Sequence, residues 1–276
     1  MIKFNDVAKG LKLPLYFTSI SPILIAWSFN LFKNYFLFIL MVVIVFFMQA
    51  ALNLSMDYFD NLNNLGVKNK DTLFPVGPYL IKNMNVKPEY LKKAFLISLI
   101  ISIIAGIFLI IFTGKYILIL IGFLAVFVSL IYVLPPFKLD ARGLGEISTF
   151  FSFGIFSLIG AFIVFSEIIN IKIILIAILL GFLASAIRFL HHITEDKKES
   201  NRVKNFKLIY VLILFSGFII QLYNIKLFIF LIPAIIISIL HFITIKGNQL
   251  KISRKTNEIV IIQIISTILI IMYFLL

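Results

Sequence analysis

The feature that most constrains this chain is a series of long, nearly uncharged apolar runs. A helix needs roughly 20 apolar residues to cross the hydrocarbon core of a bilayer, and nine runs approach or reach that length. Because the runs are continuous and do not alternate with polar residues, they predict helices and exclude the strands of a membrane barrel. The runs lie at about 13–32, 35–56, 94–113, 116–135, 147–166, 171–192, 207–222, 226–245 and 258–276.

The composition agrees with a membrane protein. Hydrophobic residues make up 62% of the 276 positions and charged residues 13%, and the mean hydropathy is +1.11. A water-soluble fold could not cover that much apolar surface. No polar block is long enough for a second core, so we expect a single all-α, polytopic membrane domain over residues 1–276. The chain has no cysteine, which excludes disulfides and thiolate metal sites.

The positive charges predict how this domain sits in the membrane. Of the 25 lysine and arginine residues, only Lys33, Lys115, Lys172 and Lys226 fall in the odd-numbered connections. The others lie before the first run or in the even-numbered connections. By the positive-inside rule, we expect an integral, multi-pass protein of the cell membrane with a cytoplasmic N-terminus and an external C-terminus. The net charge of +13 is then a topology signal and implies no nucleic acid. Among the acids, only Glu167 is expected on the outer side.

Two long polar connections, 57–93 and 193–206, follow the second and sixth runs. They occupy matching places four helices apart, which hints at two four-helix repeats with a ninth helix appended. Both lie on the expected cytoplasmic side, where we predict that they form a cap over a site.

The first connection begins with a polar stripe. Gln49, Asn53, Asp57 and Asp60 are spaced by four, four and three residues, so on a helix they share one face. Carboxylates are costly at the end of an apolar helix unless they bind something, and two of them one turn apart suit Mg²⁺. The alternative is an interfacial helix end whose acids meet water or lysines.

The second connection begins in the same way. Arg188, His192, Asp196 and Glu199 follow a helical spacing, and Glu195 lies beside them. Two facing acidic helix ends can hold a diphosphate through bridging metal ions. An interfacial histidine remains as good an interpretation of His192 as a catalytic one.

A third polar segment, 132–146, joins the fourth and fifth runs. A proline pair ends the helix, and Lys138 and Arg142 then lie on the same side as the two acidic clusters. Both residues can neutralise a phosphate. Gly143 and Gly145 permit a tight return into the membrane.

The segment from Tyr132 to Glu146 resembles the YxxPPxKLxxRGLGE segment of UbiA-type intramembrane prenyltransferases. The stretch from Asn53 to Asp60 is similar to their first aspartate-rich motif, NxxNDYxD. The resemblance spans essentially the whole chain. It is closest to the MenA-like branch, which prenylates 1,4-dihydroxy-2-naphthoate.

The resemblance implies transfer of a polyprenyl group from its diphosphate to an aromatic, quinone-precursor-like or other lipid acceptor, with Mg²⁺ as cofactor. In the motifs it implies catalytic roles for Asn53, Asp57, Asp60, Tyr132 and Asp196. The implied diphosphate-binding residues are Lys68, Lys70, Lys138 and Arg142. The implied metal ligands are Asp57, Asp60 and Asp196, with Asp71, Glu195 and His192 as further candidates.

The chain departs from the family pattern at several positions. Met56 replaces the second asparagine of the first motif, and 72–78 lacks an arginine. In the second motif, DxxxD, His192 replaces the first aspartate, which removes a magnesium ligand unless Glu195 or Glu199 substitutes.

Two rival functions stay open. One is a noncatalytic homologue that binds prenyl lipids; the other is a secondary transporter, for which Pro22 and Pro233 are the relevant mid-span residues.

Overall fold

The computed structural model describes residues 4–70, 72–134, 136–140, 142–166 and 169–276, and these ranges form helices joined by loops, without a β-sheet. Asp71, Pro135 and Glu167 lie outside the described residues. Three short segments complete the helices: 3₁₀ turns at Leu13–Leu15 and Gln221–Tyr223, and a π-helical segment at Phe150–Phe156. The α-helices are α1 (Phe4–Gly10), α2 (Tyr16–Phe29), α3 (Tyr35–Leu62), α4 (Tyr79–Lys82), α5 (Pro88–Thr113), α6 (Ile117–Val133), α7 (Gly145–Thr149), α8 (Ser157–Phe165), α9 (Ile171–His192), α10 (Asn201–Lys204), α11 (Phe206–Ile220), α12 (Ile225–Thr244), α13 (Gln249–Arg254) and α14 (Thr256–Leu275).

The ends of these helices follow from local sequence. Asn170 begins α9, where its side chain accepts a hydrogen bond from the backbone N–H of Ile173 at 3.2 Å. Pro88 occupies the first turn of α5, where a missing N–H costs nothing. Gly114 ends α5 with a φ of 65°, a conformation that glycine adopts without strain.

Within the described residues, seven helical segments are long and apolar enough to cross a bilayer, and two shorter apolar segments, Leu13–Phe29 and Ile117–Val133, accompany them. The prediction of an all-helical, integral membrane protein is therefore confirmed. The second predicted span, 35–56, is longer in the structure, because α3 continues to Leu62. Asp57 and Asp60 consequently lie on the last turns of a helix, with the loop beginning only beyond them.

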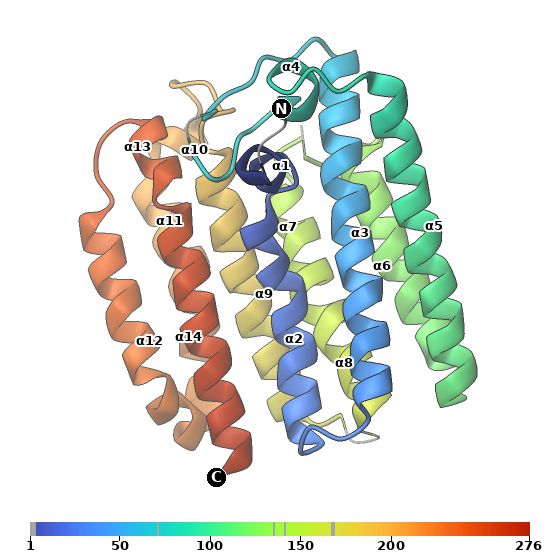
Figure 1. The fold of residues 1–276 in the computed structure, drawn as a ribbon. Helices are drawn as coiled ribbons and strands as arrows, with labels where there is room; N and C mark the ends of the chain where they lie inside the picture. Colours follow the sequence, from blue (N-terminus) through green and yellow to red (C-terminus); the bar gives the residue numbers. More distant parts are fainter. Residues whose placement is uncertain (1–3, 71, 135, 141, 167–168) are drawn as a thin grey trace.

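Helix α9 occupies the middle of the bundle, with α2, α11, α14 and the α7–α8 segment around it (Figure 1). In its apolar window 78% of the residues are buried within the protein, against 22% for α3 and 28% for α5. Lipid therefore contacts α3 and α5 far more than α9. Arg188, His191 and His192, near the end of α9, are buried as well.

One close helix contact fixes α9 against the fifth predicted span. A Cβ atom on Gly154, in the π-helical segment, would lie 2.5 Å from the carbonyl oxygen of Ala177 and from the backbone of Gly181. Only paired glycines allow the two backbones to approach so closely. The π-helical turn within this span is a departure that the apolar pattern did not indicate, and such turns are frequent near functional sites.

The short helices α1, α4, α10 and α13 gather at one end of the bundle, which we call the polar end (Figure 1). The N-terminal segment also lies there, and the C-terminus lies at the opposite end. The loop between α3 and α4 crosses this end and is tied to α9. Which end faces the cytoplasm stays a prediction from the charges, as does the proposed internal repeat.

Candidate functional site: a polar mouth over an apolar cavity

A cavity of about 720 Å³ opens below the polar end, and most of its lining is apolar. On α3 it is lined from Met41 to Met56, which corresponds to a depth of roughly 22 Å at 1.5 Å per residue. Lys12, Asn53 and Arg188 line its polar mouth. The cavity therefore matches a ligand that has a long apolar part and a charged head.

The end of α3 carries two buried carboxylates beside this mouth, next to the lining residues Asn53 and Met56. Asp57 is 1% exposed and Asp60 is 6% exposed. One oxygen of Asp57 accepts a hydrogen bond from the backbone N–H of Leu80 at 2.8 Å, and one oxygen of Asp60 pairs with Lys138 at 3.3 Å. The second oxygen of each carboxylate accepts no hydrogen bond from the described residues, so both can bind a cation.

Lys12 lies beside these carboxylates and was missed as a site residue. It is 3% exposed and interacts electrostatically with Asp57 and Asp60. Its backbone φ is 55°, and the amide of Asn53 donates a hydrogen bond to the carbonyl of the neighbouring Leu11 at 2.7 Å. Asn53 thus holds the N-terminal segment so that Lys12 closes the mouth. In the sequence Lys12 was indistinguishable from the other lysines of a cytoplasmic terminus.

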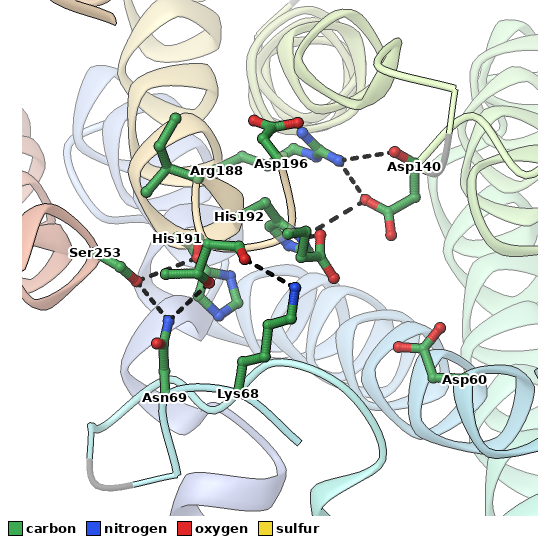
Figure 2. A network of polar contacts seen from close by, with 12 residues as sticks. Asp60, Lys68, Asn69, Asp140, Arg188, His191, His192, Asp196 and Ser253 are labelled. Carbon is green, nitrogen blue, oxygen red and sulfur yellow. Dashed lines mark hydrogen bonds and ion pairs between the residues drawn. The ribbon is translucent and has the colours of Figure 1, made fainter. Parts of the chain in front are cut away.

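Arg188 dominates the facing side, on α9. Its guanidinium pairs with Asp140 (Figure 2) and, at 2.6 Å, with Glu146. The Arg188 Nε–H also donates to the hydroxyl of Tyr132 at 3.1 Å, and that hydroxyl donates to Asp140 at 3.0 Å. The two chain segments 132–146 and α9 are thereby joined through one buried cation.

His192 and Asp196 complete this side through further pairs. The Nδ1 atom of His192 lies 2.5 Å from Glu195 and 3.8 Å from Asp140. Asp196 pairs with Arg202 at 3.2 Å. Asp140, which the sequence analysis did not single out, is therefore central to the network, whereas Asp196 points to Arg202 and does not join Asp57 and Asp60.

The pKa values of the loop acids follow from these contacts. Burial would raise the pKa of the Asp140 carboxyl, but the charges of His192 and Arg188 outweigh it and hold the pKa well below its usual range. Burial is outweighed in the same way at Glu195, where the charge and hydrogen bond of His192 lower the pKa. Burial raises the pKa of Asp196 despite the nearby Arg202.

The other predicted phosphate-binding residues contact loop carbonyls or are exposed. Lys68 donates to the carbonyl of Thr194 at 2.8 Å, beyond the end of α9 (Figure 2). Arg142 is exposed and donates to the carbonyl of Pro136 at 2.7 Å. Lys70 is exposed as well. Of the four predicted phosphate-binding cations, Lys138 is the one that the structure brings to the carboxylates of α3.

Two groups of side chains could hold a metal ion. Asp57 and Asp60 offer carboxylate oxygens at the mouth, a donor set that fits Mg²⁺. Among the described residues, Asp140, His192 and Glu195 also bring ligand atoms within 4.8 Å of one another. The third predicted ligand, Asp196, belongs to neither group and pairs with Arg202.

No protein-family model matches the chain, and no curated protein sequence matches it. One solved structure does: it is described as a digeranylgeranylglyceryl phosphate synthase in membranes. The two chains superpose with a TM-score of 0.63 and 19% sequence identity over 97% of this chain and 98% of the other. At this level of identity, the similarity shows that the two proteins share a fold.

Proposed function

We propose that the chain is a UbiA-type prenyltransferase, which transfers a prenyl group from a prenyl diphosphate to an acceptor within the membrane. The observation that carries the proposal is a deep apolar cavity, lined at its mouth by Lys12 and Arg188, with the buried carboxylates Asp57 and Asp60 beside it. A prenyl diphosphate has the matching shape, since its tail is apolar and its head carries several negative charges. The shared fold with a synthase that acts in membranes supports the same class of reaction.

In this proposal, Asp57 and Asp60 hold Mg²⁺ at the mouth, and Lys12 and Lys138 face the diphosphate. Mg²⁺, when bound, supplies positive charge that stabilises the leaving diphosphate. The bond between C1 of the prenyl group and the bridging oxygen breaks, and the electron pair stays on the diphosphate. The acceptor then bonds to C1 and gives its proton to the released diphosphate. The apolar walls exclude water, which would otherwise capture the allylic cation.

The acceptor is the finer part of the proposal. The sequence motifs favour an aromatic quinone precursor, as used by the MenA-like branch. The structural neighbour is instead named for a glyceryl phosphate product, which favours a lipid acceptor. We therefore propose an acceptor with a nucleophilic hydroxyl or aromatic carbon and compare both kinds in the assay.

The test is direct. Purified protein in lipid nanodiscs is incubated with Mg²⁺, labelled prenyl diphosphates and a panel of aromatic and glycerol-phosphate acceptors, and the products are identified by mass. We expect a prenylated acceptor from the wild-type protein, and Asp57→Asn to reduce its formation by a factor of about 100 or more. Asn63→Ala is the control, because Asn63 is exposed and donates only to its own helix at Phe59.

Two results would contradict the proposal. Full activity in Asp57→Asn would remove the α3 carboxylates from the reaction. Magnesium-dependent binding of prenyl diphosphates without any product would identify a noncatalytic prenyl-lipid binder.

A further inference from the structure

The acids near the end of α9 are already neutralised by cations of the chain itself. Each of the four carboxylates on this side has a guanidinium or imidazole partner within ion-pair distance. The pairs are Asp140–Arg188, Glu146–Arg188 at 2.6 Å, Glu146–Arg202 at 2.7 Å, Asp196–Arg202 at 3.2 Å and Glu195–His192 at 2.5 Å.

The carboxylates of α3 differ. In the described part of the chain, Asp60 has a single ion pair, with Lys138, and Asp57 has none, although Lys12 interacts electrostatically with both carboxylates. Asp57 is 1% exposed, and its second carboxylate oxygen accepts no hydrogen bond from the described residues. A bound cation would pair with that oxygen, next to the cavity-lining residues Asn53 and Met56.

The Arg188 side chain is buried and closely packed. Its side chain is 6% exposed, and a Cβ atom on Gly145 would lie 2.0 Å from the guanidinium carbon. Gly145 therefore leaves the volume that the guanidinium fills. Because removing one partner from a buried ion pair costs about 3–5 kcal/mol, Asp140 and Glu146 are not readily released to bind a metal.

The remaining candidate ligands are too close together to share an ion. Metal–nitrogen and metal–oxygen bonds of about 2.0–2.2 Å, at right angles or wider, keep two ligand atoms roughly 2.8 Å or more apart. His192 Nδ1 and Glu195 Oε2 lie 2.5 Å apart, which is a hydrogen bond. The cluster of Asp140, His192 and Glu195 is thus held by this hydrogen bond and, at Asp140, by the ion pair with Arg188.

We propose that the protein binds one divalent cation with the diphosphate, at Asp57 and Asp60, and that Arg188 occupies the place of a second. This inference rests on the proposed function for its diphosphate ligand. It differs from the two-metal arrangement that facing aspartate motifs imply, because His192 and Arg188 turn the second motif into a set of internal ion pairs.

The experiment counts bound ions. Mn²⁺ replaces Mg²⁺, and electron paramagnetic resonance measures free Mn²⁺ during titration of the protein with a non-reacting geranylgeranyl thiolodiphosphate present. We expect one Mn²⁺ per chain in the wild-type protein, binding at least tenfold weaker in Asp57→Asn, and unchanged binding in Glu195→Gln. Asp57→Asn and Glu195→Gln are matched, because each replaces one carboxylate with an amide, the first on the α3 side and the second on the α9 side.

Two bound ions in the wild-type protein, no bound ion, or a tenfold loss in Glu195→Gln would each overturn the inference. These results are separable from the proposed function. A protein that forms product while binding two ions keeps the function and loses the inference. A protein that binds one ion at Asp57 and Asp60 without forming product keeps the inference and loses the function.

Discussion

Gly145 is the residue on which the arrangement of Arg188 most directly depends. Replacing Gly145 with alanine puts a methyl group where the guanidinium lies and should push Arg188 away from Asp140 and Glu146. We expect Gly145→Ala to lower the free energy of unfolding by about 3 kcal/mol, the lower part of the range for a broken buried ion pair.

Thermal unfolding in detergent, compared with Gly122→Ala, tests this expectation. A Cβ atom on Gly122 meets nothing within 4 Å, so that variant should unfold like the wild-type protein. Equal melting temperatures for the two variants would show that Arg188 can move aside at no cost.

At the scale of residues, the sequence was informative where spacing along one helix decides contact. Asp57 and Asp60 lie one turn apart, so their shared face followed from helical geometry. The partners of Arg188 did not follow, because Asp140 and Glu146 are more than 40 positions away in the chain. Which of many lysines enters the site was equally hidden, since Lys12 is selected by the hydrogen bond from Asn53 to Leu11.

Among the elements, the loop between α3 and α4 depends on Asn69 for its attachment. The Asn69 amide donates to Thr194 at 3.1 Å and to Ser253 at 2.8 Å, so one side chain joins this loop to the turn after α9 and to α13 (Figure 2). We expect Asn69→Ala to speed hydrogen exchange in residues 64–70 and 72–78 at least tenfold, since the loop loses its side-chain ties. Mass spectrometry of exchanged peptides measures the effect.

The control for the loop is Asn63→Ala, which removes a bond within α3 and should leave exchange in the loop unchanged. Equal exchange in Asn69→Ala and the wild-type protein would mean that Lys68 and the Lys68–Val76 backbone pairing suffice to hold it.

Helix α5 contributes Gly106 to the cavity wall, and a Cβ atom there would meet nothing within 4 Å. Gly106→Phe should fill part of the cavity and reduce transfer of geranylgeranyl groups about tenfold while sparing the shorter geranyl group. Competition between the two diphosphates in one assay measures the ratio. Ile100→Phe adds bulk at an exposed position of the same helix and should leave the ratio unchanged. An unaltered ratio in Gly106→Phe would place the tail elsewhere.

For elements, apolar run lengths predicted the helices well because the bilayer leaves few alternatives. They did not predict the π-helical turn at Phe150–Phe156, where Gly154 packs closely against Gly181 of α9, a contact that lies far apart in the sequence. They also ended the second span at 56, because an apolar count stops where charged residues begin, although α3 continues to Leu62.

At the scale of the whole molecule, the orientation in the membrane is a prediction that rests on the distribution of charges alone. The chain has no cysteine, so single cysteines can be placed at will. In intact cells, a membrane-impermeant maleimide should label Tyr116→Cys and should not label Asn63→Cys. Both positions are exposed. Asn63 follows the end of α3, and Tyr116 follows the end of α5 on the opposite side of the bundle. The reverse pattern would invert the predicted topology; permeabilised cells, in which both react, are the control.

The two sides of the mouth are carried by helices with very different surroundings. Asp57 and Asp60 lie on α3, of whose apolar window 22% is buried within the protein, whereas Arg188 lies on α9, where the share is 78%. A bilayer thicker or thinner than the apolar length of α3 tilts or shifts that helix at a cost of fractions of a kcal/mol per Å. Helix α9 has less contact with lipid and should shift less. The distance between the α3 carboxylates and Arg188 should therefore vary with membrane thickness. The turnover rate of the proposed reaction should then peak in lipids of one acyl-chain length.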